Sequence, residues 1–173
     1  MMRRFLARWR QDERGASAVE FALILPLLLV VLLGTVTMFD LFRTAQSAEK
    51  STFTVGDMLS RQTAISQTLL TSMLTFVEKT VTYDGSARLR ASSISNVAGT
   101  LVLDWSHSVG NQSLAIDPID YAVVPDLAVG DSVILTEVYL PHRAFVPAFG
   151  LDHIVYYNKA VHRPRFVGKI AYQ

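Results

Sequence analysis

The strongest feature of the sequence is an uninterrupted apolar run near its N-terminus. Residues 21–39 read FALILPLLLVVLLGTVTMF, and no charged residue lies between Glu20 and Asp40. In a helix, this run would be about 28 Å long, close to the ~30 Å hydrocarbon core of a bilayer. Core helices of soluble proteins are seldom apolar on every side for five turns. The pattern therefore predicts a transmembrane helix over residues 16–40.

Helical periodicity continues beyond the apolar run. Apolar residues recur at spacings of three and four from Val55 to Val77, which is typical of an amphipathic helix. We expect this helix to cover residues 41–82, with a bend near Gly56.

The pattern changes in the C-terminal half of the chain, where residues alternate with a period of two. This alternation predicts strands over residues 100–106, 132–140 and 153–161, and more weakly over residues 86–97. Both faces of the 132–140 strand are largely apolar, which is typical of a central strand. The predicted fold class is α+β: a long N-terminal helix, transmembrane and then amphipathic, followed by a small, mainly antiparallel β-sheet domain over residues 83–173.

The distribution of charge predicts the orientation of the helix in the membrane. Only Asp12 and Glu13 oppose the five arginines of the first fifteen residues, and the flank after the apolar run is nearly neutral. The positive-inside rule therefore places the N-terminus in the cytoplasm and the residues after about position 40 on the other side. The arginines are Arg3, Arg4, Arg8, Arg10 and Arg14.

The junction before the apolar run has the most specific pattern. A basic leader ends at Gly15, small or apolar residues follow, and Glu20 stands at the edge of the run. Glycine lets an extended backbone approach a protease closely, and a cut after it would leave Ala16 with a free ammonium group. Ala16 and Glu20 lie four residues apart, on one face of a helix. A carboxylate costs at most about 2.5–3.5 kcal/mol within a membrane, and a cationic partner relieves that cost.

This junction resembles a prepilin peptidase site. The wider pattern, with the later segments LVLDWS, SVILTEVYLPHRAF and HRPRF, is similar to TadE-like minor pilins (TadE/TadF) of tight-adherence (Tad, or Flp) type IV pilus systems. The resemblance implies that a prepilin peptidase cuts the Gly15–Ala16 bond and removes a cytoplasmic leader, residues 1–15. It also implies that Glu20 pairs with the new N-terminal amine of an adjacent subunit and sets the register of assembly.

The resemblance also implies a location and a set of partners. The protein would be a single-pass protein of the bacterial inner membrane with a pilin-like periplasmic domain, and it would serve pilus assembly and adhesion. Its partners would be the prepilin peptidase, other Tad pilins and pseudopilins, the assembly platform in the inner membrane, and the lipid bilayer. Phe21 stands where major pilins carry tyrosine, and about 130 residues follow the span. Both features favour a minor pseudopilin that is not an enzyme.

Three alternatives stay open. A removable secretory signal usually has a shorter apolar core and a small-x-small cut site, whereas the nearest such site here, Ala45–Ser47, lies well past the run. An uncleaved, signal-anchored periplasmic binding module would keep its leader, and Glu20 would be incidental. An exported hydrolase would use the histidines.

The sequence offers little for catalysis, metals, cofactors or nucleic acid. The chain has no cysteine, which excludes disulfides and thiolate sites, and its net charge is +1. Its four histidines lie in separate segments that match no catalytic or metal motif, with Asp104 near the first of them. We expect no catalytic residue, metal, cofactor or small-molecule substrate. The histidines are His107, His142, His153 and His162.

Two groups of C-terminal residues have more than one interpretation. A basic group could form a solvated sheet edge, or a surface that binds acidic partners, lipid headgroups or DNA. The solvated edge is the preferred interpretation. A second group of aromatic residues fits a subunit contact and core packing equally well. The basic group is Lys159, His162, Arg163, Arg165 and Lys169, and the aromatic group is Phe145, Phe149, Tyr156 and Tyr157.

Overall fold

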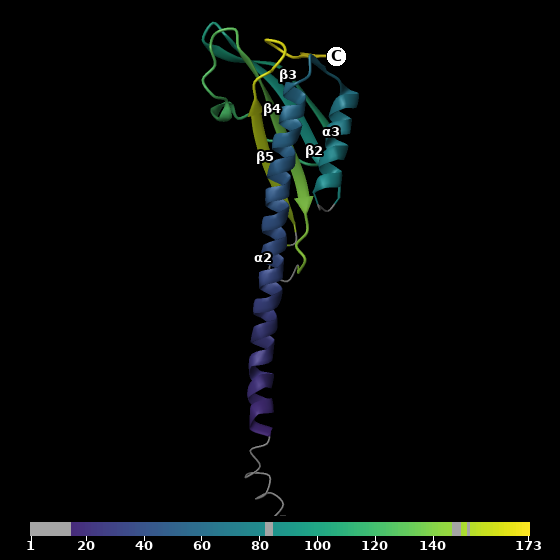
Figure 1. The fold of residues 1–173 in the computed structure, drawn as a ribbon, viewed down its shortest axis with the longest axis vertical. Coiled ribbons are helices and arrows are strands. Elements are labelled where there is room, and N and C mark those ends of the chain that lie inside the picture. Colours follow the sequence, from purple (N-terminus) through teal and green to yellow (C-terminus); the bar gives the residue numbers. More distant parts are fainter. Residues whose placement is uncertain (1–14, 82–84, 147–149, 152) are drawn as a thin grey trace, which may run out of the picture.

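One long helix organises the whole molecule. The structure is a computed structural model that describes residues 15–81, 85–146, 150–151 and 153–173. Helix α2 (Ala16–Ser60) is about 68 Å long at 1.5 Å per residue, and the rest of the described chain packs beside its C-terminal part (Figure 1). The N-terminal part of the helix, residues 16–39, projects from this domain and is called the stalk below.

An antiparallel sheet of four strands lies beside the packed part of α2. The order of its strands is β3-β2-β4-β5, so the strand predicted to be central, β4, has a neighbour on each side. A further, parallel pair of two-residue strands, β1 and β6, closes the end of the domain far from the stalk. The predicted α+β class, a long helix followed by a small antiparallel sheet, is confirmed. The strands are β1 (Ala64–Ile65), β2 (Arg88–Val97), β3 (Thr100–Gly110), β4 (Ser132–His142), β5 (Ile154–His162) and β6 (Ala171–Tyr172).

The helix expected over residues 41–82 is interrupted. Helix α2 continues through Gly56 and ends at Ser60, and a second helix, α3 (Gln67–Thr80), begins after Ser66. The side chain of Ser66 accepts a hydrogen bond from the Leu69 backbone N–H, which caps the new helix. The apolar spacing stays regular across this break because both helices turn their apolar faces to the same sheet.

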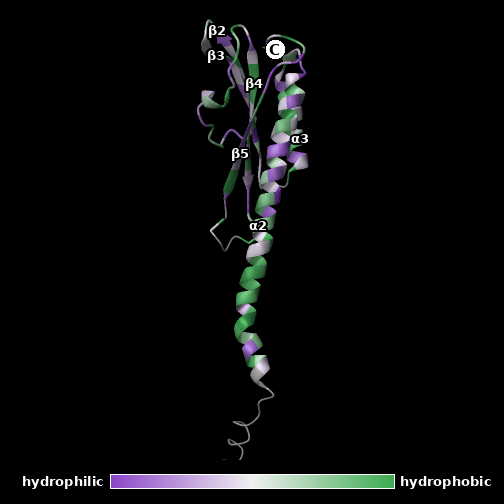
Figure 2. Cartoon of the chain, turned by 60° about the vertical axis from the view of Figure 1, so that its left-hand side comes forward, coloured by the Kyte–Doolittle hydropathy of each residue, from purple (hydrophilic) through white to green (hydrophobic). Residues whose placement is uncertain are grey.

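The sheet is covered on both faces (Figure 2). Helices α2 and α3 pack on one face, where Leu59, Leu70 and Leu89 are fully buried in a single core. The connection between β3 and β4, which contains the short 3₁₀ helix η2 (Tyr121–Val123), packs on the other face around Ile94. The strands therefore bury residues of both faces, as the sequence predicted for β4.

Candidate assembly site on the N-terminal helix

The predicted cleavage bond lies where α2 begins. Gly15 is the residue before the helix and already has helical backbone angles (φ −95°, ψ −10°), and Ala16 is the first residue of α2, so the Gly15–Ala16 bond lies at the start of the helix. Gly15 is exposed, and no other part of the described chain lies within 4 Å of the position that a Cβ would take. The described part of the chain therefore leaves open space beside Gly15. The remainder of the predicted leader, residues 1–14, lies outside the described residues.

Glu20 lies on the surface of α2, one turn after Ala16. Its side chain is exposed, and among the described residues it takes part in none of the ion pairs. Within residues 15–81 and the other described segments, this carboxylate therefore lies beside an apolar helix surface with no cation paired to it. Such a carboxylate is available to a cationic group from another molecule.

The stalk is a largely apolar helix (Figure 2), and apart from Gly34 and Thr37 its residues of described burial are exposed. The most apolar window of α2 has a mean hydropathy of 2.6, yet only 6% of it is buried. Leu23 is 73% exposed and Leu27 is 63% exposed. Each such side chain gains about 1.5–3 kcal/mol when it leaves water, so this surface favours an apolar environment. The low burial argues against a helix from a soluble core, and the helix is compatible with a single-pass membrane anchor.

The domain holds α2 at the point where the apolar run ends. Nε2 of His142, at the end of β4, lies 3.0 Å from Oδ2 of Asp40, the first acidic residue after the run. The Tyr156 hydroxyl of β5 donates a hydrogen bond of 3.0 Å to the Leu41 carbonyl. Burial, and then the negative charge of Asp40, raise the pKa of Tyr156, so this hydroxyl keeps its proton. Two strands thus fix the domain to the top of the stalk.

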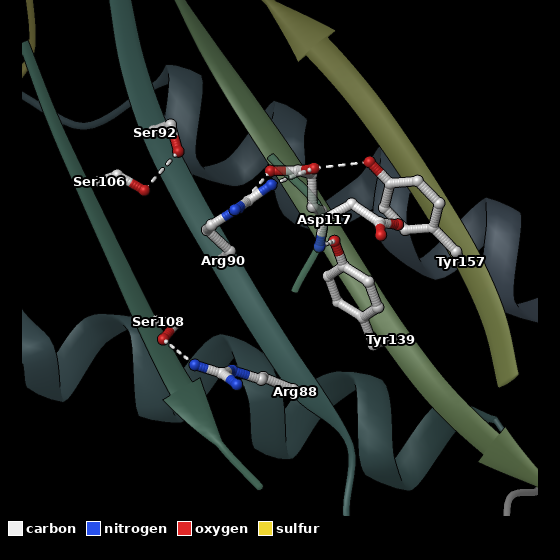
Figure 3. Close-up of polar contacts among 9 residues, drawn as sticks. Arg88, Arg90, Ser92, Ser106, Ser108, Asp117, Tyr139 and Tyr157 are labelled. Carbon is white, nitrogen blue, oxygen red and sulfur yellow. Dashed lines mark hydrogen bonds and ion pairs between the residues drawn. The ribbon is translucent and has the colours of Figure 1, made fainter. Parts of the chain in front are cut away.

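A buried charge cluster connects three strands on the sheet face away from α2 (Figure 3). Arg90 of β2 donates two hydrogen bonds to the Glu137 carboxylate of β4, from Nε at 2.5 Å and from Nη2 at 2.7 Å. The Tyr157 hydroxyl of β5 donates a third at 2.6 Å. Burial, and then the bond to Glu137, raise the pKa of Tyr157. Burial lowers the pKa of Arg90, but the bond to Glu137 outweighs it, so that pKa is raised.

This cluster was not found from the sequence, although one signal was present. Glu137 is fully buried and Arg90 is 8% exposed, so no substrate can reach the ion pair. Its place between β2, β4 and β5 indicates a structural role in fixing the register of the sheet. The signal was Glu137 itself, an acidic residue within the otherwise apolar pattern of the best predicted strand.

The four histidines lie in four different surroundings. His142 meets Asp40, His107 stacks on Tyr172 with ring centroids 3.5 Å apart, and His153 is exposed. His162 packs edge-on against Phe53 of α2, and its two ring nitrogens are buried without a hydrogen-bond partner among the described residues. Burial lowers the pKa of His162. Within the part of the chain that the structure describes, no three His, Cys, Asp or Glu residues form a metal-binding group.

Asp104 and the cations of the C-terminal basic group form ion pairs within the domain. Asp104 accepts hydrogen bonds from Ser93 and Ser95 and pairs with Lys169. The other three pairs likewise connect the C-terminal residues to different elements, so these cations bind the chain to itself. They are Lys159–Asp120, Arg163–Asp131 and Arg165–Asp57.

The predicted aromatic group divides into buried and exposed members. Tyr156 and Tyr157 are half-buried and bond to Leu41 and Glu137, which is core packing. Phe145 is 68% exposed, and Phe149 lies outside the described residues.

A comparison with known protein families agrees with the resemblance drawn from the sequence. Residues 15–56 match the family model of TadE-like proteins. The match begins at the glycine of the predicted junction and runs through the stalk into the packed part of α2. No curated protein and no solved structure matches the chain.

Proposed function

From the TadE-like segment at residues 15–56, we propose that the protein is a membrane-anchored minor pseudopilin that acts in the assembly of a Tad (Flp) type IV pilus. The observation that carries this proposal is the stalk, an apolar helix that begins at the Gly15–Ala16 bond and is exposed along most of its length. The stalk crosses the bacterial inner membrane, with the N-terminus in the cytoplasm and the domain in the periplasm. The chain performs no reaction of its own.

In this proposal, a prepilin peptidase cuts the Gly15–Ala16 bond. Its position at the start of the helix supports cleavage, because Gly15 is exposed and the described chain leaves open space beside it. The cut gives Ala16 an ammonium group, which pairs with Glu20 of an adjacent subunit. Two unit charges 4 Å apart attract by about 4 kcal/mol near a protein surface, which is enough to offset the cost of a carboxylate at the membrane edge.

Exposed aromatic side chains from the end of the stalk into the packed part of α2 offer a further surface for neighbouring subunits. Phe39, Phe42 and Phe53 are each more than 60% exposed, and their spacing keeps them near one side of the helix. A groove of about 750 Å³ lies between α2 and β5, with Phe53 among its lining residues. An aromatic stripe that continues from the stalk supports side-by-side packing with other pilin-like helices.

The first test is the N-terminal mass of the membrane-extracted protein, from cells with and without the prepilin peptidase. We expect a chain that begins at Ala16 only in cells that have the enzyme. Gly15→Leu should retain the leader in both strains. Gly168→Leu is the matched control, because Gly168 is also exposed with open space around it, and its leader should be lost normally.

A leader retained in both strains would overturn the proposed processing. The uncleaved, signal-anchored binding module would then become the better account, since that protein needs neither Gly15 nor Glu20.

A further inference from the structure

Strand β4 ends and strand β5 begins at the end of the domain that faces the stalk. Strand β4 ends at His142, which contacts Asp40, and β5 begins at Ile154, two residues before Tyr156, which bonds to Leu41. Both contacts lie at Asp40 and Leu41, directly after the C-terminal end of the apolar run of α2. In Figure 2, the ends of β4 and β5 lie beside the helix just above its hydrophobic part. The residues between these strands therefore start at the level where the apolar run ends.

The burial of α2 shows that the domain extends past this boundary. Thr37 is 1% exposed and Gly34 is half-buried. The residues on either side of Thr37, Val36 and Met38, are 41% and 48% exposed. Thr37 and Gly34 lie about 5 and 9 Å below Asp40 along the helix axis. One face of the last two turns of the apolar run is therefore covered by the chain. If residues 21–39 occupy the hydrocarbon core, the contacts at Asp40 and Leu41 lie at the depth of the lipid headgroups.

The side chains at this end of the domain suit a membrane interface. Phe145 is 68% exposed and Val155 is 49% exposed, and Arg143 between β4 and Phe145 is exposed as well. An exposed phenylalanine ring gains about 1.5–3 kcal/mol when it leaves water, whereas an arginine head keeps its charge in a polar layer. This combination is typical of segments that lie at the boundary between headgroups and acyl chains, where the ring enters lipid and the cation meets phosphate.

We propose that Arg143, Phe145 and Val155 form a second membrane contact, in which Phe145 enters the headgroup–acyl boundary and Arg143 binds lipid phosphate. The occupant of this surface is the bilayer, because the surface continues the exposed apolar band of the stalk at the depth that this band fixes. The domain therefore stands on the membrane at a set tilt, held by its helix and by this contact. The inference depends on the membrane-spanning stalk of the proposed function.

The absence of cysteine makes a direct test possible, since single cysteines can be labelled without a background. A nitroxide is placed by Phe145→Cys, Val129→Cys or Leu28→Cys in the full chain, reconstituted into phosphatidylcholine–phosphatidylglycerol vesicles. Val129 is the matched control: it is 69% exposed, like Phe145, and lies at the opposite end of the sheet, next to Gly130, whose N–H bonds to Asn96. Electron paramagnetic resonance then compares the accessibility of each label to oxygen, which concentrates in lipid, and to a water-soluble nickel chelate.

We expect the label at position 145 to be several-fold more accessible to oxygen relative to nickel than the label at position 129. A label at 145 that behaves like the one at 129 would overturn the inference. Shielding of the 145 label from both reagents would also overturn it and would indicate a protein contact. The Leu28 label separates the two proposals: if it meets the nickel chelate, the stalk does not span the membrane and the proposed function fails as well. If the Leu28 label is in lipid while the 145 label is in water, only this inference fails.

Discussion

Removal of the Glu137 carboxylate should destabilise the domain more than any surface change. Glu137→Leu deletes the acceptor of three hydrogen bonds, two from Arg90 at 2.5 and 2.7 Å and one from Tyr157 at 2.6 Å. It leaves the Arg90 cation, 8% exposed, without a counter-charge. Breaking a buried ion pair from one side costs about 3–5 kcal/mol, against a total stability of about 5–15 kcal/mol for a typical domain.

A triple variant separates the cost of a broken pair from the value of the intact one. Arg90→Met, Glu137→Leu and Tyr157→Phe together remove the charges and the hydroxyl, and leave apolar groups of similar size in their place. Since desolvation offsets most of the attraction within a buried pair, the free energy of unfolding should return to within about 1–2 kcal/mol of the wild type. The measurement is urea unfolding of the full chain in mild detergent, followed by near-ultraviolet circular dichroism.

Glu49→Leu, which removes an exposed carboxylate from α2, is the matched control and should change the free energy of unfolding by less than about 0.5 kcal/mol. The reasoning is refuted if Glu137→Leu costs no more than this control, or if the triple variant is as unstable as the single one.

Three further predictions concern α2. Gly56→Ala should lower the free energy of unfolding by about 1–2 kcal/mol, because a Cβ there would lie 2.5 Å from Nδ1 of His162, and adding His162→Ala should reverse the loss. Burial lowers the pKa of His162 in the folded protein, so the unfolded chain binds a proton at this side chain more readily. The free energy of unfolding should therefore be constant above about pH 6.5 and fall below it. Urea midpoints taken from pH 5 to 7 measure this dependence, and His162→Leu should flatten it. Glu20→Ala should leave cleavage intact but reduce surface pili about tenfold, a loss of about 1.4 kcal/mol, whereas Glu49→Ala should not; normal piliation by Glu20→Ala would exclude the register role.

The sequence predicts the strands only as far as their burial depends on apolar side chains. The period-two pattern identifies β3 and β4 well. Strand β2 gives a weak signal because its buried residues are largely polar: Ser92 is fully buried and bonds to Ser106, and Arg90 pairs with Glu137. A hydropathy pattern does not identify a polar residue that is buried together with its hydrogen-bond partner. The partner of Arg90, Glu137, lies 47 residues away in the sequence, and only the register of β2 and β4 brings these two residues together.

The break between α2 and α3 was missed for a different reason. A run of apolar residues at spacings of three and four reports which residues face a core, but not whether the backbone between them is continuous. Ser66 is a good helix-capping residue, and Gln62 forms a side-chain bond back to the Met58 carbonyl. The apolar spacing of three and four residues continues across the end of α2 and the start of α3, so it predicts one continuous helix despite the capping residue between them.

The junction at Gly15–Ala16 and Glu20 could be found from the sequence because its chemistry is local. A leader, a glycine and a carboxylate at fixed spacing need no distant partner. The structure adds that the helix starts at Ala16 and that Glu20 is exposed. Cleavage and register depend on other molecules and therefore stay predictions.

The distribution of polarity in this chain is the reverse of the one expected for a soluble protein. The domain buries a glutamate and an arginine in the middle of its sheet, where each neutralises the other, while the stalk leaves leucines such as Leu23 and Leu27 more than 60% exposed. The first arrangement needs nothing from outside, because its charges and hydrogen bonds are satisfied within three strands. The second is stable only when other apolar matter surrounds the stalk, either lipid or neighbouring helices. Folding of the domain and placement of the stalk are therefore separable: a variant of Glu137 should destabilise the domain, whereas the stalk depends on its surroundings.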